Sequence, residues 1–178
     1  AYIKASAGSA FEPARAHAYV DHAAQALAFA EGEMGVRYVL ATGSIDYHQH
    51  FPGASSGLRA LKAGIVDGRI LGKDLRRLRM PLATTLLWGG MTIAGEDLPH
   101  FFKVGRSWGS TMKVAGLVAS YALERAAGHP RGLRLANGNG LIAGLWAAAQ
   151  RRGVRVLTGA CVESLTMDGP IPARVSGA

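Results

Sequence analysis

The stretch of sequence that decides the fold is RGLRLANGNGLIAGLWAAAQRRGVRVL, residues 131–157. Leu133–Ala136 predicts a short strand, the Asn-Gly pairs at 137–140 predict a tight turn, and Leu141–Arg152 repeats apolar residues at helical spacing. A glycine then ends the helix, and the valine-rich Val154–Leu157 is typical of a strand. Strand, helix and strand in this order predict a βαβ-like unit. The predicted fold class is α/β, with α+β as the alternative.

The first two thirds of the chain are predicted to be mainly helical. The elements expected there are a helix over Pro13–Glu33, a strand over Val36–Ala41, an ordered loop over Thr42–Ser56, a hairpin over Ile65–Leu71, a short basic helix over Lys73–Arg79, irregular elements over Leu82–Trp108 and a helix from Ser110 or Thr111 to Ala127. A further strand is expected over Cys161–Met167. We therefore expect two parts, a helical and irregular insertion (1–129) containing loop 42–56 and a strand–helix–strand part (130–178).

Two of these helices are predicted to bury an apolar face. The apolar positions recur at spacings of three and four residues, which places them on one side of a helix. They are Tyr19, Ala23, Ala26, Leu27 and Ala30 in the first helix, and Leu141, Ile142, Leu145, Trp146 and Ala149 in the last.

Composition excludes several classes of protein. Hydrophobic residues make up 49% of the chain and charged residues 18%, so a buried core is possible and wholesale disorder is excluded. The net charge of +8 favours anionic partners in general without identifying one. No uncharged apolar run reaches ~18 residues, which excludes a transmembrane helix. The single cysteine, Cys161, and the lack of a signal-peptide pattern favour the cytoplasm.

The turn at Gly138–Ala143 fits the relaxed dinucleotide-binding pattern G-x-G-x-x-[G/A] between a strand and a helix. A helix N-terminus offers free N–H groups and a partial positive charge to a phosphate. Glu163 follows Gly140 at about the spacing of a ribose-binding carboxylate. Too little chain follows the second strand for a complete mononucleotide-binding half, so the pattern favours a glycine turn needed for close packing.

Loop 42–56 contains Asp46-Tyr47-His48-Gln49-His50, the densest cluster of titratable groups. Two histidines at this spacing could chelate a metal, but no third ligand of suitable type supports them. Tyr47 could donate its phenolic proton or act as a general acid or base. The alternative is an aromatic residue that packs within the loop, which the local pattern favours.

Two basic clusters, Arg76–Arg79 and Arg151–Arg155, raise the question of nucleic-acid binding. A binding surface would join such clusters into one stripe with aromatic residues between them. These clusters are separate in the sequence, and cations near a helix C-terminus are favoured by the helix dipole. Solvated helix faces are therefore the favoured interpretation, and no nucleic-acid partner is expected.

Three motifs together resemble one known family. Arg131–Leu145 is similar to the R-G-x-x-L-x-x-G-N-A-L-[VI]-A-x-L stretch of flavoproteins in the fumarate reductase/succinate dehydrogenase superfamily, in particular 3-ketosteroid dehydrogenases. Ile45–Ala54 resembles their P-D-Y-x-x-x-x-P-G loop, and Asp67–Gly72 resembles their D-G-R-x-L-G hairpin. The N-terminal G-x-G-x-x-G of that family has no counterpart in this chain, and Ile45 and Gly140 depart from its usual proline and alanine.

The resemblance implies an internal piece of an FAD-dependent dehydrogenase that introduces or reduces a C=C bond next to a ketone in a steroid-like substrate. Tyr47 matches an active-site tyrosine of the family that assists the proton step. Val162 matches the residue whose backbone binds the adenine of FAD, and Gly138, Asn139 and Gly140 would form a glycine turn near the flavin. The alternative is a non-catalytic, basic interaction domain that is related to flavoproteins only by ancestry.

The partners that this reading implies are a small ketone or steroid and the rest of a parent polypeptide. Because the pyrophosphate-binding turn is missing, we expect the 178-residue chain alone not to retain FAD. An apolar face left without its partner layer would also permit self-association. No metal is expected.

Overall fold

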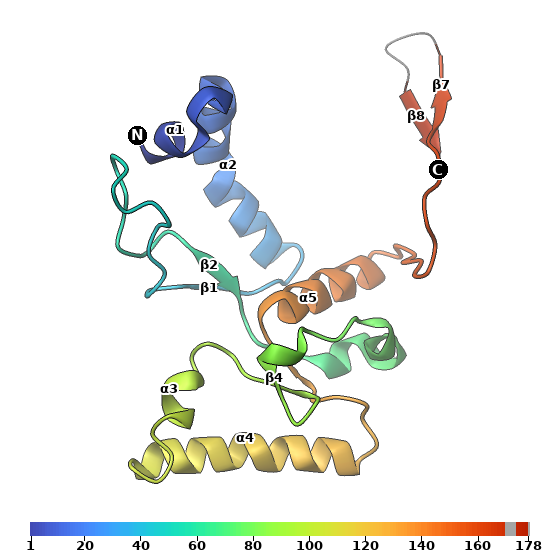
Figure 1. Cartoon of the computed structure of the whole chain (residues 1–178). Coiled ribbons are helices and arrows are strands. Elements are labelled where there is room, and N and C mark those ends of the chain that lie inside the picture. The colour runs from blue at the N-terminus through green and yellow to red at the C-terminus, as the bar shows by residue number, and fades with distance from the viewer. Residues whose placement is uncertain (170–173, 178) are drawn as a thin grey trace.

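The computed structural model describes residues 1–169 and 174–177. Helices and short strands are interspersed along the chain (Figure 1). The helical elements are α1 (Tyr2–Ala7), η1 (Gly8–Ala10), α2 (Pro13–Gly32), η2 (Gly68–Arg77), η3 (Ala83–Thr85), α3 (Leu98–Phe101), α4 (Trp108–Ala126) and α5 (Asn137–Arg151). The strands are β1 (Tyr38–Leu40), β2 (Leu61–Ala63), β3 (Val66–Asp67), β4 (Leu86–Leu87), β5 (Met91–Thr92), β6 (Arg134–Leu135), β7 (Thr166–Asp168) and β8 (Arg174–Gly177). The α/β class is confirmed.

The described strands form four separate antiparallel pairs: β1 with β2, β3 with β6, β4 with β5, and β7 with β8. In the first pair Tyr38 faces Ala63 and Leu40 faces Leu61. In the second, Val66 faces Leu135 and Asp67 faces Arg134. Each pair joins two segments of the chain that are separated by a loop or by several other elements. Because none of these pairs extends into a wider sheet, the packing of helices holds the fold together.

The core lies where α5 crosses η2. Its buried members come from η2 and the residue after it, from β6 and the residue before it, and from α5. They are Leu71, Leu75, Leu78, Leu133, Leu135, Ala143, Trp146 and Ala147. Figure 1 shows α5 (orange) at the centre, beside η2 (green). Burial of aliphatic side chains is the main stabilising term in such a cluster. The core therefore joins residues from both sides of position 130.

The hairpin predicted over Ile65–Leu71 is wrong. The Asp67 carboxylate accepts a hydrogen bond from the Arg69 N–H at 2.9 Å, and this cap starts η2 instead of a turn. Val66 pairs with Leu135 rather than with the chain that follows it. An Asp-Gly pair can cap a helical turn as well as form a hairpin, and here the cap prevails because η2 buries Leu71 and Leu75.

The βαβ-like unit is also corrected. Helix α5 begins at Asn137, so the predicted turn at 137–140 is its first turn. Residues 154–157 form no strand, and the predicted strand over Cys161–Met167 is reduced to β7. A strand requires a hydrogen-bonded neighbour. No described strand lies beside residues 154–157, where the Val156 carbonyl instead accepts a bond from the Arg77 guanidinium at 2.8 Å.

The two long helices outside the core were predicted more closely. Helix α4 begins at Trp108, a few residues earlier than expected, because the Ser107 side chain accepts a bond from the Ser110 N–H. Val114, Leu117, Val118 and Tyr121, on one face of α4, are half-buried. Helix α2 matches its prediction in length, but none of its residues is buried. In the part of the chain that the structure describes, no helix is both long and apolar enough to cross a membrane.

Candidate functional site

A cavity of about 710 Å³ opens at the N-terminus of α5. One wall is the segment Arg79–Thr85, which connects η2 to β4, and the other is the first turn of α5. Thr92 of β5 contributes to the lining. This volume lies within the ~300–1,000 Å³ typical of small-molecule sites. The predicted residues Gly138 and Asn139 both line the cavity.

The first turn of α5 presents backbone donors at this cavity. Ala136 precedes the helix and provides no side-chain cap, while its carbonyl accepts from the Gly140 N–H at 3.1 Å. Asn137 has φ of 53°, a left-handed conformation that asparagine tolerates better than most residues. The first N–H groups of a helix lack intrahelical acceptors and carry a partial positive charge. The geometry therefore suits an anionic or hydrogen-bond-accepting ligand.

Arg131 fixes the two walls of the cavity to each other. Its guanidinium donates to the Leu78 carbonyl at 3.1 Å and to the Asn139 side-chain oxygen at 2.8 Å. The Asn139 amide in turn donates to the Arg79 carbonyl at 3.0 Å. Arg131 therefore links the chain that follows η2 to the first turn of α5.

Arg131 is also a buried positive charge. It is 2% exposed, and its Nε lacks a hydrogen-bond partner among the described residues. The groups that accept hydrogen bonds from its guanidinium there are carbonyl and amide oxygens rather than carboxylates. Burial lowers the pKa of its guanidinium from the ordinary value. Since a buried cation without a counter-ion is costly, the positive charge behind this cavity favours a negative group nearby.

Gly138 and Gly140 occupy different environments. A Cβ at Gly138 would meet no atom within 4 Å, whereas a Cβ at Gly140 would lie 2.8 Å from the Gly64 carbonyl oxygen and 3.1 Å from that of Leu135. Gly140 is buried against backbone and does not line the cavity. Gly138 leaves space for a ligand, while Gly140 allows α5 to approach the end of β2.

Tyr47 lies apart from this cavity, in loop 42–56. Its side chain is 99% exposed, and no hydrogen bond to it is present among the described residues. The loop around it is ordered by Asp46, whose carboxylate accepts from the Ser55 N–H at 2.7 Å and from the Arg59 guanidinium at 3.1 Å. His48 stacks on Phe51 with ring centroids 4.7 Å apart. The loop therefore holds Tyr47 outward on a fixed support.

The β1–β2 pair connects this loop to α5. The Ala41 N–H donates to the Ala60 carbonyl at 2.8 Å where the loop begins, and Gly64 at the other end touches α5. Tyr47 lies in the loop beyond one end of this ladder, and Gly138 and Asn139 lie in the helix that packs against the other end. The structure therefore does not bring Tyr47 together with the two residues at the cavity.

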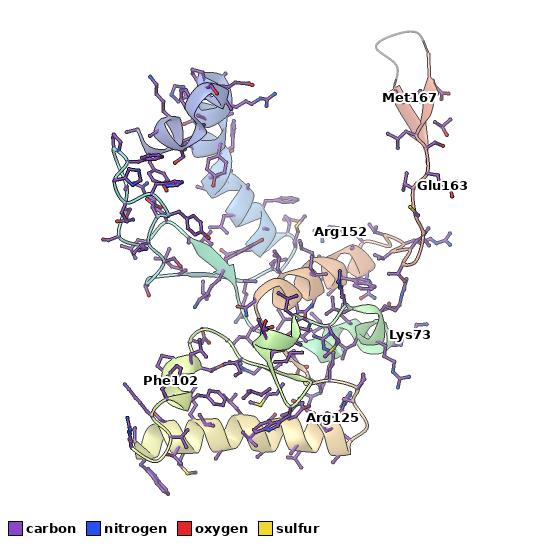
Figure 2. The ribbon with its side chains drawn as sticks, in the orientation of Figure 1. Lys73, Phe102, Arg125, Arg152, Glu163 and Met167 are labelled. Atoms are coloured by element: carbon purple, nitrogen blue, oxygen red, sulfur yellow. The ribbon has the colours of Figure 1, made fainter. Side chains whose placement is uncertain are left out.

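Val162 is 64% exposed and lies in the extended segment after α5. Figure 2 shows Glu163 and Met167 on this segment, away from Arg152 at the end of α5. The Val162 carbonyl accepts only a weak hydrogen bond, from the thiol of the neighbouring Cys161 at 3.8 Å. The backbone of Val162 is therefore available to a ligand or to another strand.

Sequence analysis missed a second buried polar centre, at Asp97. This carboxylate is 0% exposed and accepts from the Arg134 guanidinium at 2.6 Å and from the Ala94 N–H at 3.1 Å, with the Lys113 ammonium 3.7 Å away. The centre ties α3, α4 and β6 together. Nothing in the local sequence at Asp97 distinguishes it from a surface carboxylate, because its partners are distant in the chain.

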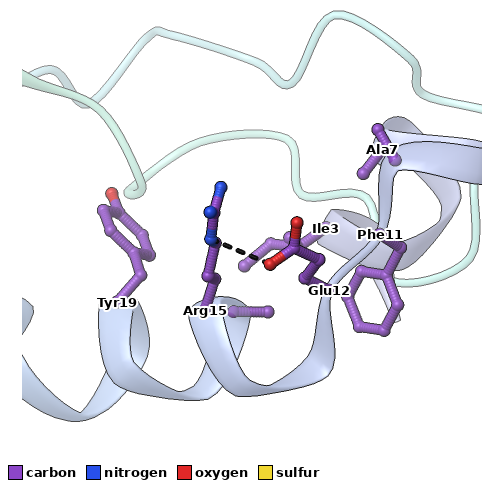
Figure 3. A pocket seen from close by; sticks show the side chains of 8 residues that line it. Ile3, Ala7, Phe11, Glu12, Arg15 and Tyr19 are labelled. Carbon is purple, nitrogen blue, oxygen red and sulfur yellow. Dashed lines mark ion pairs between the residues drawn. The ribbon is translucent and has the colours of Figure 1, made fainter. Parts of the chain in front are cut away.

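A second hollow of about 320 Å³ lies between α1 and α2, lined by Ile3, Phe11 and Tyr19 among others. Figure 3 shows the ion pair between Glu12 and Arg15 across it, at 2.8 Å. Both side chains are largely exposed. In the described residues, no group of three His, Cys, Asp or Glu side chains is placed to hold a metal ion.

Comparison with known proteins identifies relatives along the whole chain. The family of the FAD binding domain matches residues 1–178. A 4-oxocyclohex-2-ene-1-carboxylate 5-dehydrogenase of Sinomonas cyclohexanicum is 32% identical over 99% of this chain and 30% of its own length. The crystal structure of a 3-ketosteroid delta1-dehydrogenase from Sterolibacterium denitrificans, in complex with 1,4-androstadiene-3,17-dione, is 28% identical, with a TM-score of 0.83 over 99% of this chain and 32% of that one. The chain thus spans about a third of the length of these relatives.

Proposed function

This chain belongs to the FAD-binding domain family, and on that premise we propose that it forms part of an FAD-dependent dehydrogenase acting on a cyclic ketone. The cofactor expected from the motifs, FAD, is that of the family. The observation that carries the proposal is the cavity at the N-terminus of α5, whose wall includes the predicted residues Gly138 and Asn139. The relatives act on ring ketones, one a carboxylate and the other a steroid.

The residues at this cavity fit one portion of FAD. The uncapped first turn of α5 offers N–H donors, and Gly138 leaves open space where any side chain would intrude. The exposed backbone at Val162 could pair with adenine, which presents both a donor and an acceptor. Gly140 contributes by letting α5 approach β2 closely, so we assign it to the shape of the site. When bound, FAD supplies the acceptor for a hydride.

Tyr47 is the proposed residue for the proton step. Its phenol is exposed and lacks a described protein partner, so its O–H is free to bond a substrate oxygen. The phenolic O–H of a tyrosine can donate a hydrogen bond, so Tyr47 is assigned the role of donor. Asp46 and Arg59 hold the loop that carries it. In this role the Tyr47 O–H would bond the ketone oxygen and make the hydrogen on the carbon beside the carbonyl more acidic. That proton would pass to water and the hydride from the next carbon to FAD, which leaves a C=C bond.

The remaining functional assignments follow from this proposal. Residues 1–129 would supply the substrate side of the site and residues 130–178 the cofactor side, with one packed core between them. The rest of a parent polypeptide would complete FAD binding, and we expect the 178-residue chain alone to lose the cofactor on purification. The exposed, free Cys161 agrees with a reducing cytoplasmic location.

The test is anaerobic reduction of the flavin in the full-length protein that contains this chain. The purified holoprotein is mixed with androst-4-ene-3,17-dione or with 4-oxocyclohexanecarboxylate, and the visible flavin absorbance is followed. Bleaching by at least one ring ketone, with appearance of the unsaturated product, is the expected result. A flavin that neither ketone nor its unsaturated product reduces or reoxidises would contradict the proposal.

A further inference from the structure

The lining of the cavity at the N-terminus of α5 combines apolar side chains with one cationic side chain. Met80, Leu82 and Ile142 are apolar, and Arg79 carries the positive charge. None of the lining residues carries a carboxylate. A ligand that matches this lining has a hydrocarbon ring and an anionic group.

Arg79 is free to bind such a group. Its side chain is exposed and makes no ion pair or hydrogen bond among the residues that the structure describes, whereas neighbouring Arg77 is tied to Asp74 at 2.9 Å. The backbone of Arg79 is nevertheless fixed, because its carbonyl accepts from the Asn139 amide at 3.0 Å and lies 3.5 Å from the Arg131 guanidinium. A fixed backbone with an unengaged guanidinium is suited to bidentate recognition of a carboxylate.

Two further observations point to an anion. Thr92 lines the cavity at 4% exposure, and its hydroxyl has no hydrogen-bond partner within the described ranges 1–169 and 174–177. Arg131, which bonds the Asn139 side chain, is a buried cation whose hydrogen-bond partners in the described part of the chain include no carboxylate. An unpaired buried hydroxyl and an uncompensated buried charge both cost free energy, which a bound oxyanion would reduce.

We propose that the Arg79 guanidinium, together with the unpartnered Thr92 hydroxyl in the same lining, forms an anion subsite that holds the carboxylate of a small ring ketone, beside the first turn of α5 that the proposed function assigns to FAD. Arg131 and Asn139 act as positioning residues. The inference rests on the proposed function, because it defines the substrate class of that same cavity. It predicts preference for a cyclic keto acid over a neutral steroid. The shared chemistry is an oxyanion, so a phosphate of FAD is the competing source of the same contact.

The experiment uses the full-length holoprotein and measures two affinities by titration calorimetry. The probes are cyclohexanecarboxylate, which cannot be dehydrogenated next to a ketone, and its neutral methyl ester. Arg79→Ala should weaken carboxylate binding roughly 10- to 100-fold, as expected for a charge-assisted hydrogen bond, and leave ester binding within about 2-fold. Arg79→Lys should give an intermediate loss. Arg76→Ala, an exposed arginine of η2 outside the cavity lining, is the matched control and should change neither affinity.

The outcomes separate the alternatives. Equal weakening of both probes, or no weakening of either, overturns the anion subsite. Loss of FAD from Arg79→Ala with unchanged carboxylate affinity in the remaining holoprotein also overturns it and assigns Arg79 to a cofactor phosphate. Carboxylate binding that depends on Arg79, in a protein whose flavin no ring ketone reduces, supports the subsite and contradicts the proposed dehydrogenase function.

Discussion

Helices α5 and α2 differ in burial although their sequences predict both equally well. Helix α5 buries Gly140, Ala143, Gly144, Trp146, Ala147 and Ala148 against η2, β2 and β3. Helix α2 is longer and buries none of its residues, and Tyr19, Val20 and Phe29 are more than half exposed. An apolar face at helical spacing therefore predicts a helix, but it does not say where the partner of that face lies.

The contrast divides the molecule into a packed body around α5 and two exposed parts. One exposed part is α1–α2 with loop 42–56, and the other is the segment 154–169 after α5 (Figures 1 and 2). Two residues predicted for function, Tyr47 and Val162, lie in the exposed parts, while Gly138 and Asn139 lie at the edge of the body. Substitution of Tyr47 should change turnover without changing stability, and substitutions in the core of the body should lower stability.

The largest effect is expected from Tyr47→Phe in the full-length protein. Loss of the phenolic O–H should lower turnover by roughly 10²- to 10⁴-fold, the range for general acid–base groups. FAD content and the unfolding midpoint should not change, because the side chain is 99% exposed. Steady-state turnover with a ring ketone and flavin absorbance provide the two readouts. His48→Ala, which removes the ring stacked on Phe51, is the control and should reduce turnover less.

Near-normal turnover in Tyr47→Phe would contradict the catalytic assignment. The packing role that the local pattern favoured is already excluded by the 99% exposure of this side chain. A fall in turnover accompanied by loss of FAD would instead show that the loop supports the cofactor. Either result would contradict the proposed difference in function between the exposed parts and the packed body.

The next effect is on stability. Leu135 is 0% exposed within the core, so Leu135→Ala should lower the free energy of unfolding by ~2–5 kcal/mol. Phe29 in α2 is 54% exposed, so Phe29→Ala should change the free energy of unfolding by less than about 0.5 kcal/mol. Urea denaturation of the 178-residue chain measures both. A loss of more than about 1 kcal/mol for Phe29→Ala would mean that α2 is packed in solution, for example through self-association of this face.

Sequence patterns predicted the positions of the helices well because helical periodicity is local. The buried face predicted for α5 was wrong, since Trp146 is buried as expected but Ile142 is 47% exposed, and the small residues Ala143 and Ala147 are buried instead. Helices α2, α4 and α5 all lie within a few residues of their predicted ranges. The strands were predicted poorly because a strand depends on a partner that is distant in sequence. Val66 pairs with Leu135, and β2 was missed entirely. Residues 154–157 have a strand-like composition but no strand beside them among the described residues.

The candidate site was predictable only in part, for the same reason. The glycine turn at Gly138 and Asn139 was recognised from its local pattern. Arg79 was assigned to a solvated basic cluster, because its position at a cavity depends on contacts from Arg131 and Asn139 that lie 52 and 60 residues away. The burial of Arg131 likewise results from the packing of the whole body, and the residues next to it in the sequence do not indicate it.

A smaller effect separates the two glycines of the turn. Gly140→Ala would place a Cβ 2.8 Å from the Gly64 carbonyl, where backbone must move, and should destabilise the chain by ~1–3 kcal/mol. Gly138→Ala meets no atom within 4 Å and should be neutral or stabilise by up to about 1 kcal/mol, because alanine restricts the unfolded chain. Thermal unfolding of the two variants side by side checks the difference. Equal destabilisation would show that the close approach of α5 to β2 is not required.

The smallest effect is expected at the ion pair between Glu12 and Arg15 in Figure 3. The two side chains are 58% and 83% exposed, so water and salt screen their attraction, and exposed pairs of this kind contribute ~0–0.5 kcal/mol. Arg15→Ala also places a better helix former near the start of α2, which offsets part of the loss. The unfolding free energy of the 178-residue chain should therefore change by less than about 0.5 kcal/mol, and by less still at high salt. If the variant instead loses more than about 1 kcal/mol, and loses it only at low salt, the α1–α2 part is held by its charges. In that case its exposure no longer distinguishes it from the packed body around α5.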